Sequence, residues 1–483
     1  MQNKHLSRNL MWVVFSRVIS LLSSVAVGLL LPKIFSVSDY GYFKVFTLYA
    51  VYMALLHFGF VDGILLKLAG KEYSELDFEK TRAYTKFFVF FESLISLPIL
   101  LCGIVFADGE YSFILVMLAL NMVFVNVTTY YQFVSQATQR FREYSAKNFI
   151  VAVVKLAFVL GLFAIYFFDV SAVSYKVYLI GLNVLDLSMA IWYVYIYRDI
   201  TFGKSVALSS IKKDVLDIFK IGFVLTAAYQ ASHLVLALDR QFVNLLFPME
   251  TFAVYSFAYN IITMISTVVS SLSMVLLPML KRSSVEYTIG YYKKSISVVA
   301  IVMSCALLSY FPLVWFIGWF LPNYSASLEY IAVLLPTLVF TSGVTVVMFT
   351  IEKVLDRSFA FFKTACAILL LGLITNTVAY FVFGTPKAIS YASLGVMAVW
   401  FLWEGISLAR RTKVTVYKEF IFISLISAGF LAVTTCMPNV VFGFLAYAAF
   451  LVALIVTLYF PLVKAAFLTF AGRSDKSERA SEG

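Results

Sequence analysis

The chain has 483 residues, of which 62% are hydrophobic and 13% are charged, and its mean hydropathy is +0.92. Soluble domains carry about 25% charged residues, so the composition excludes a soluble globular protein and predicts a polytopic membrane protein. The formal net charge is +11, which raises the question of a nucleic-acid partner. We expect none, because the basic residues border the apolar segments and their positions are explained by membrane topology.

Fourteen apolar runs follow one another along the chain, each of about 20 residues, which is the length that crosses a bilayer as a helix. They cover residues 10–31, 42–66, 86–107, 111–135, 148–168, 173–197, 218–246, 252–279, 295–318, 328–350, 359–383, 387–409, 418–437 and 440–463. The predicted fold class is therefore an all-α polytopic membrane protein with about 14 transmembrane helices.

The Lys and Arg residues are distributed unevenly between the two sides of these runs. If the N-terminus is cytoplasmic, 30 of the 37 Lys and Arg residues lie in inner segments, and only Lys33, Lys176 and Lys387 lie in outer ones. This asymmetry follows the positive-inside rule. We therefore expect both termini in the cytoplasm.

Similar short motifs recur at nearly one offset, which indicates a duplication. Residues 39–43 and 251–255 open helices 212 positions apart, and residues 172–175 and 388–391 open helices 216 positions apart. Six helices per copy is an even number, so both copies enter the membrane in the same orientation, related by an axis along the membrane normal. The predicted domains are an N-lobe (1–200, helices 1–6), a C-lobe (201–412, helices 7–12), two C-terminal helices (413–463) and a polar cytoplasmic tail (464–483) that its composition predicts to be disordered.

The stretch 218–247 differs from the other apolar runs because it contains His233, Asp239 and Arg240. Its polar positions recur in steps of three and four and form one helical stripe: Thr226, Gln230, His233, Ala237, Arg240/Gln241 and Asn244. Ionisable side chains in hydrocarbon are costly and usually face a bundle interior or a hydrated cavity. We therefore expect this helix to line a hydrated cavity.

Basic and amide side chains within the apolar runs are the candidate substrate-binding residues: Arg17, Lys44, Gln132, Lys155, Gln230, His233, Arg240 and Asn244. Three embedded acids are candidate counter-charges or proton-coupling groups: Glu92, Asp186 and Asp239. Other interpretations stay open at this point. Lys44 lies near the outer surface and can snorkel, and a single histidine such as His233 is often a packing residue. Asp239 and Arg240 can each neutralise the other or a neighbour.

Motifs that would indicate an enzyme are missing from the sequence. There is no G-x-x-x-x-G-K-[ST] and no H-E-x-x-H or G-x-S-x-G motif. The four cysteines have no paired spacing. We expect no metal, no cofactor and no catalytic activity.

Several of these segments resemble known sequences. LLPK at 30–33, SDYGYF at 38–43, FAVYSFAY at 252–259 and the preceding Asp239–Arg240 pair resemble bacterial O-antigen and capsule flippases. These belong to the multidrug/oligosaccharidyl-lipid/polysaccharide exporter superfamily. The resemblance implies two six-helix lobes, often with two extra helices, and a cationic central cavity that receives a pyrophosphate and a glycan.

The function that the resemblance implies is translocation of undecaprenyl-diphosphate-linked oligosaccharide repeat units across the bacterial inner membrane, for surface polysaccharide biosynthesis. The implied partners are this lipid-linked substrate and membrane lipids, with a polysaccharide polymerase and a chain-length regulator as further candidates. A drug/cation antiporter of the same superfamily is the first alternative, and it would favour a cavity dominated by acids. A membrane polysaccharide polymerase is the second, although even the longest outer loops, of about ten residues, leave little room for a catalytic site.

Overall fold

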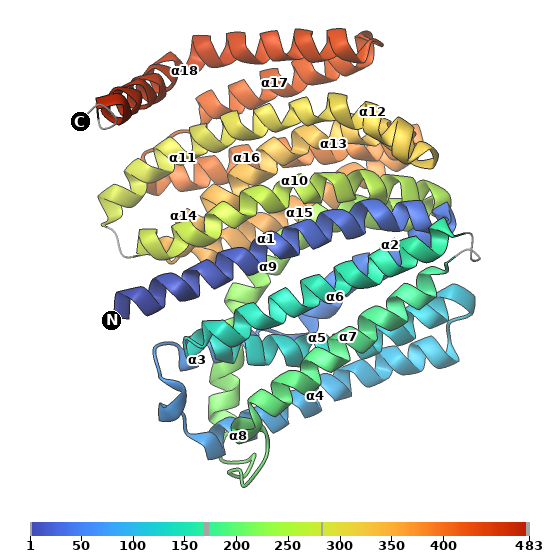
Figure 1. The fold of residues 1–483 in the computed structure, drawn as a ribbon, viewed down its shortest axis with the longest axis vertical. Helices are drawn as coiled ribbons and strands as arrows, with labels where there is room; N and C mark the ends of the chain where they lie inside the picture. Colours follow the sequence, from blue (N-terminus) through green and yellow to red (C-terminus); the bar gives the residue numbers. More distant parts are fainter. Residues whose placement is uncertain (1, 169–172, 282–283, 480–483) are drawn as a thin grey trace. The chain divides into compact units, whose positions relative to one another are not determined.

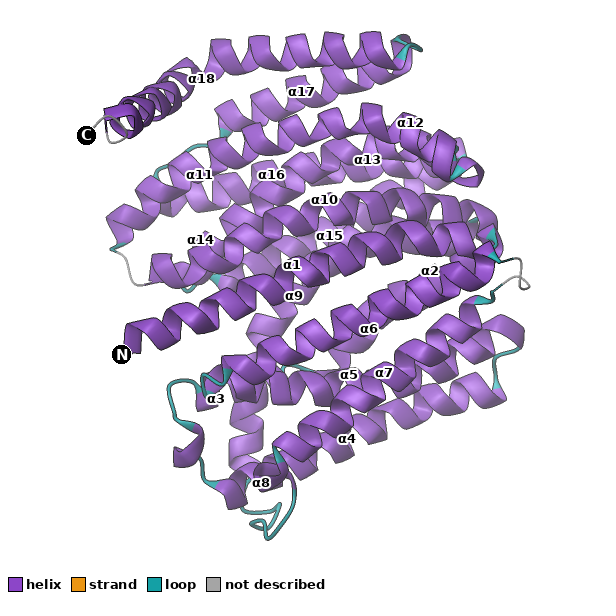
Figure 2. Cartoon of the chain, viewed as in Figure 1, coloured by secondary structure: helices purple, strands orange, loops and turns teal. Residues whose placement is uncertain are grey.

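The computed structural model describes residues 2–168, 173–281 and 284–479, with side chains described at 15–16, 18–168, 173–267, 284 and 286–460. Over the described residues every regular element is helical, with no strand (Figure 2). The helices are α1 (Gln2–Ile34), α2 (Val37–Met53), α3 (Phe60–Leu68), α4 (Phe78–Val105), α5 (Gly109–Ala137), α6 (Phe141–Phe167), α7 (Tyr175–Ile196), α8 (Arg198–Thr201), α9 (Lys212–Leu246), α10 (Met249–Lys281), α11 (Val285–Ala306), α12 (Tyr310–Phe320), α13 (Ser327–Ser342), α14 (Phe349–Val354), α15 (Ser358–Phe383), α16 (Pro386–Thr412), α17 (Tyr417–Cys436) and α18 (Val440–Arg479) (Figure 1).

Each of the fourteen predicted segments falls on one of these helices or on a consecutive pair of them. Within the described part of the chain, 11 helices are long and apolar enough to cross a membrane, or 12 if the bent pair formed by Val37–His57 and Phe60–Leu68 is one span. The prediction of an all-α polytopic membrane protein of about 14 helices is confirmed.

The second predicted helix is not continuous, which corrects the expectation of one run over 42–66. After α2, a 3₁₀ turn, η1 (Ala54–His57), leads to Phe58 and Gly59, which have φ values of 48° and 84°. Both values lie in the left-handed region, which ends a right-handed helix. The two parts therefore meet at an angle of 53°.

The chain forms two compact units. The first contains residues 1–268 and 357–389, and the second contains residues 269–356 and 390–483. The predicted lobe boundaries at residues 200 and 412 concern repeat topology, and they stay a prediction.

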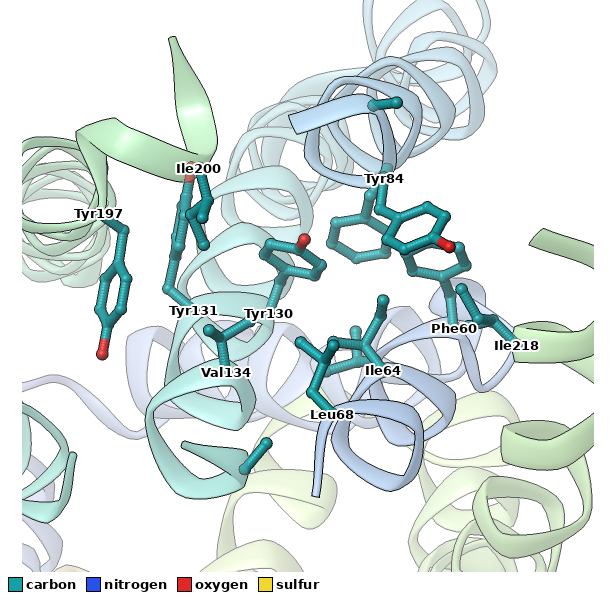
Figure 3. Close-up of a cluster of buried hydrophobic side chains, with 14 of the residues drawn as sticks. Phe60, Ile64, Leu68, Tyr84, Tyr130, Tyr131, Val134, Tyr197, Ile200 and Ile218 are labelled. Atoms are coloured by element: carbon teal, nitrogen blue, oxygen red, sulfur yellow. The ribbon is translucent and has the colours of Figure 1, made fainter. Parts of the chain in front are cut away.

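In the first unit, α1 packs along α6 and α15 packs along α9. Its core is rich in aromatic rings (Figure 3). Phe88 stacks on Tyr130 with centroids 5.3 Å apart, and Tyr131 stacks on Tyr197 at 5.7 Å. Buried phenols in this core find polar partners, as where Tyr130 shares a hydrogen bond with Thr85 at 2.9 Å. This core joins α3, α4, α5 and α7 into one block.

In the second unit, side-chain hydrogen bonds join helices that are far apart in sequence. The Ser297 hydroxyl donates to Glu419 at 2.6 Å, and the Tyr447 hydroxyl donates to the Ser304 carbonyl at 3.1 Å. Phe430 and Tyr447 meet edge to face at 5.2 Å. These contacts attach α17 and α18 to α11.

The last helix differs from the sequence-based expectation. Residues from 464 onwards were expected to be disordered because they are polar, but α18 is helical as far as Arg479, with a kink at Tyr459 (φ −122°). Ala, Lys, Glu and Arg favour helices, and this local preference outweighs the low hydrophobicity of the segment.

Candidate functional site

The polar stripe of α9 is buried, as its period predicts. Thr226, Gln230, Ala237 and Asn244 are all less than a tenth exposed. His233, Arg240 and Gln241 are half-buried, whereas Ile221, Phe223, Tyr229 and Leu245 on other faces of the helix are exposed. The helix therefore turns its polar face inward, towards its neighbours in the first unit.

Arg240 lies against an aromatic ring and not against an acid. Its guanidinium carbon is 4.0 Å from the ring centroid of Tyr259. It forms no ion pair with a described residue, and its buried Nε has no hydrogen-bond partner among them. The Tyr259 hydroxyl donates to the Leu236 carbonyl, which fixes the ring beneath the cation.

Asp239 is held by other groups. One carboxylate oxygen accepts the backbone N–H of Arg240 at 2.7 Å, and the other accepts the hydroxyl of Tyr255 at 2.8 Å. The sequence left open that Asp239 and Arg240 neutralise each other. Their side chains form no ion pair, because side chains of adjacent residues on a helix do not face each other.

Lys44 is a second basic residue within the apolar part of the first unit. Its Nζ donates to Asn260 Oδ1 at 3.2 Å, and Asn260 Nδ2 donates to the Gly28 carbonyl at 3.1 Å. The ring of Tyr40 lies 5.0 Å from Nζ. Lys44 therefore contacts α10 and, through Asn260, α1. The interpretation that it snorkels to the surface is not supported by these inward contacts.

A third polar contact joins α9 to α2. The Tyr52 hydroxyl donates to Gln241 Oε1 at 3.1 Å, and Gln241 Nε2 donates to the Tyr49 hydroxyl at 3.2 Å. Amides and phenols thus accompany the two basic residues on the same helices.

The other candidates lie elsewhere in the first unit. Gln132 donates to Asn148 at 3.2 Å and accepts from Lys147 at 3.5 Å, between α5 and α6. Lys155 is half-buried on α6 and has no hydrogen bond or ion pair with the side chains described. Arg17 is on α1, and its side chain lies outside the described residues.

The remaining two acids have amide partners. Glu92 is 0% exposed and accepts from Asn126 at 2.8 Å, and Asp186 accepts from Asn121 at 2.8 Å. Both amides are on α5. No basic residue in the described part pairs with either acid, and their counter-charge or proton-coupling role stays a prediction.

Several polar residues at these contacts were not singled out in the sequence. Asn260, Tyr255 and Tyr259 come from α10, and His57 and Asp62 come from the broken second span. Thr226 donates to Asp62, 164 residues away, and His57 Nδ1 accepts the Gly59 N–H at 3.1 Å. Two signals were available for Tyr255 and Tyr259: their place in the FAVYSFAY segment at 252–259, and their four-residue spacing. This spacing places the two phenols on one face of the helix.

A separate charged cluster lies outside the membrane-spanning segments. Arg140 lies 4.6 Å and 4.7 Å from the rings of Tyr73 and Tyr197, and its guanidinium makes two hydrogen bonds to Glu143. Burial raises the pKa of each of these two tyrosines to about 12. Burial lowers the pKa of Arg140, but Tyr197 and Glu143 outweigh it and the net change is upward. The phenols stay neutral and the guanidinium stays charged at physiological pH.

A comparison with protein families shows which class of protein the chain belongs to. A family model described as "Polysaccharide biosynthesis protein" matches residues 6–284. Because this is more than half of the 483 residues, the chain belongs to that family, and through it to the multidrug/oligosaccharidyl-lipid/polysaccharide exporter superfamily. The expected resemblance is confirmed. None of the curated proteins compared with the chain matches it.

Solved structures share the fold at low sequence identity. The lipid II flippase MurJ, in an inward closed conformation, is 12% identical with a TM-score of 0.67, over 94% of this chain and 99% of that one. A single-residue mutant of the MATE transporter VcmN from Vibrio cholerae is 13% identical with a TM-score of 0.55, over 86% and 99%. An inward-facing MATE family multidrug transporter is 14% identical with a TM-score of 0.57, over 83% and 96%.

Proposed function

We propose that this protein is a flippase for undecaprenyl-diphosphate-linked oligosaccharide repeat units. It moves them from the cytoplasmic to the periplasmic leaflet of the bacterial inner membrane for O-antigen, capsule or exopolysaccharide synthesis, and both its termini are cytoplasmic. The polysaccharide biosynthesis family and a fold shared with a lipid II flippase support this proposal. It acts as a transporter and not as an enzyme.

The observation that carries the proposal is the environment of Arg240 and Lys44. Both are basic, both lie within apolar spans, and neither forms an ion pair with any side chain described. Hydrogen bonding from Arg or Lys offsets the desolvation of a diphosphate. The amide of Gln241 and the phenols of Tyr49 and Tyr52 supply the neutral groups that sugars bind.

Reconstituted vesicles test the proposal directly. The substrate is a fluorescent undecaprenyl-diphosphate oligosaccharide in the inner leaflet, and its appearance outside is followed by quenching. Arg240→Ala removes a charge-assisted hydrogen bond donor and should slow translocation by about tenfold or more. Arg240→Lys should retain part of the rate, because it keeps the charge and loses the planar fork.

The matched control is Arg142→Ala, since Arg142 is exposed on α6 and its loss should leave the rate unchanged. Translocation by Arg240→Ala at the parent rate would show that Arg240 does not bind the substrate. No translocation by the parent protein would contradict the flippase proposal itself.

A drug/cation antiporter remains the second candidate because Glu92 is completely buried. That function predicts efflux of cationic dyes that Glu92→Gln abolishes, with lipid-linked oligosaccharide left in place.

A polymerase predicts a different cellular phenotype. Loss of a flippase should leave single lipid-linked units in the cytoplasmic leaflet, because the charged head group cannot cross about 30 Å of hydrocarbon unaided. Loss of a polymerase should instead display single units on the cell surface. A polymerase and a chain-length regulator are the partners that we propose act on the exported units.

A further inference from the structure

The backbones of α3 and α9 touch at a glycine crossing. A Cβ added at Gly222 would lie 1.9 Å from the Gly59 carbonyl oxygen, and one added at Gly63 would lie 2.0 Å from the Ile218 carbonyl oxygen. Small residues let helices approach this closely in membranes. Ile218, fully buried, lies beside Phe60 at the same crossing (Figure 3).

Ion pairs also join α9 to its neighbours near its N-terminal end, before the glycine crossing. Asp214 on α9 forms ion pairs with Lys67 of α3 and Lys80 of α4, each at 2.7 Å. The side chains are partly open to solvent, with exposed fractions of 26% for Asp214, 26% for Lys67 and 39% for Lys80. On the other side of the crossing, Thr226 donates to Asp62. The Asp214 carboxylate thus connects α9 with both α3 and α4.

The contact residues on α9 recur at every fourth position: 214, 218, 222 and 226. The next hydrogen bond from α9 to the second span is at Gln241, which is about 22 Å further along at 1.5 Å per residue. Gln230 and His233 lie on α9 between these two contacts. The second span is therefore hydrogen-bonded to α9 on both sides of its 53° bend.

We infer that the α3–α9 contact is a releasable closure at the cytoplasmic end of the substrate path, with Asp214, Lys67 and Lys80 as its ionic catch. This inference rests on the proposed transport function, and it takes the route of a head group from the cytoplasm to the polar stripe of α9 to run between the second span and α9. Alternating access requires one end to be shut while the other is open. Partly exposed ion pairs suit a catch, since each contributes little and breaks readily.

Thiol labelling tests the closure without any transport. In a full-length protein whose four native cysteines (Cys102, Cys305, Cys366 and Cys436) are replaced by serine, Ile218→Cys places a thiol at the buried crossing. A membrane-impermeant maleimide added to inside-out vesicles should label it slowly. Asp214→Asn removes both ion pairs, and labelling should accelerate roughly three- to tenfold, the range expected for a partly exposed charge network.

The matched control is Asp217→Asn, which removes the same charge from an exposed position three residues further along α9 and should leave the labelling rate unchanged. A charge reversal distinguishes loss of the ion pairs from general misfolding, because only the former can be rescued by reversing the partner charges. Asp214→Lys alone should label faster still, and adding Lys67→Asp and Lys80→Asp should return the rate towards the parent value. Equal labelling of Asp214→Asn and Asp217→Asn would overturn the inference, as would a triple reversal that labels as fast as Asp214→Lys.

A reversible lock separates this inference from the proposed function. Lys67→Cys with Asp214→Cys, joined by a short bifunctional methanethiosulfonate, should stop lipid-linked oligosaccharide translocation in vesicles, and reduction of the linker should restore it. Translocation that continues at the parent rate while the linker is in place would refute the closure and leave the flippase standing. If the reduced double variant and the parent both fail to translocate, the flippase proposal fails, and the labelling rates still decide whether the contact opens.

Discussion

Two charged clusters in the first unit, Arg140 with Glu143 and Asp214 with two lysines, are built in different ways. Arg140 lies between two tyrosine rings and makes two hydrogen bonds to a glutamate three residues away. Asp214 joins lysines from two other helices, and one ring, that of Tyr84, lies 5.2 Å from Lys67 Nζ. The first cluster is held by packing as well as charge, and the second mainly by charge between helices. This difference indicates a permanent joint in one place and a separable contact in the other.

The largest loss of stability should come from removing the Arg140 side chain. Arg140→Ala deletes two cation–π contacts and two hydrogen bonds to Glu143, at a cost of about 2 kcal/mol in unfolding free energy. Thermal unfolding in detergent, followed by fluorescence-detected size exclusion, should show a lower midpoint. Asp214→Asn should leave the midpoint nearly unchanged, and an equal loss in the two variants would erase the distinction between the clusters.

Widening the glycine crossing should have the next largest effect. In Gly222→Ala the new Cβ meets the Gly59 carbonyl, and such overpacking costs about 1–3 kcal/mol. The helices should separate, so the Ile218→Cys thiol should react faster with the impermeant maleimide. Gly161→Ala is the matched control, since nothing lies within 4 Å of its added Cβ. Slow labelling in both variants would show that the crossing tolerates a methyl group.

A smaller difference between the two clusters should appear when the salt concentration is raised. Raising the ionic strength from about 0.1 M to 1 M shortens the Debye length from about 10 Å to 3 Å, which weakens exposed pairs more than packed ones. Labelling of the Ile218→Cys thiol should therefore accelerate severalfold with salt. The thermal midpoint difference between the parent and Arg140→Ala should stay constant. A labelling rate independent of salt would mean that the ion pairs do not hold the contact shut.

The smallest effect concerns alkaline pH. The pKa of Tyr73 and of Tyr197 is about 12 in the folded protein and about 10 in an unfolded chain. Their neutral forms therefore contribute stability that is complete below about pH 10 and is lost as the pH rises towards 12. Tyr73→Phe should reduce the fall in thermal midpoint over that window. If Tyr73→Phe leaves this fall in thermal midpoint unchanged, the loss of stability at alkaline pH comes from other groups.

Much of the fold could be predicted from the sequence, because spanning helices are set by local composition. The fourteen apolar runs all fall on helices, and the polar period in α9 predicted which of its faces is buried. The break at Phe58 and Gly59 was missed because a left-handed residue leaves no gap in hydropathy. The Asp62–Thr226 contact was missed because it joins residues 164 positions apart, and no local pattern specifies such a pair. Asp239 and Arg240 form no direct ion pair, since neighbours on a helix point in different directions, and the neutralisation of each by the other or by a neighbour stays a prediction.

The every-fourth-residue contact on α9 also determines how far the two helices can stay together. Four residues exceed one turn of 3.6, so each successive contact is displaced by about 40° around the helix axis. A row of this kind runs obliquely across the helix surface, and a partner that follows it must cross at an angle. A short helix such as α3, with nine residues (Phe60–Leu68), stays close to the row over its whole length, and a longer straight helix would leave it. The break before α3 therefore sets the length of the contact, and restoring a continuous helix there would carry the second span away from α9.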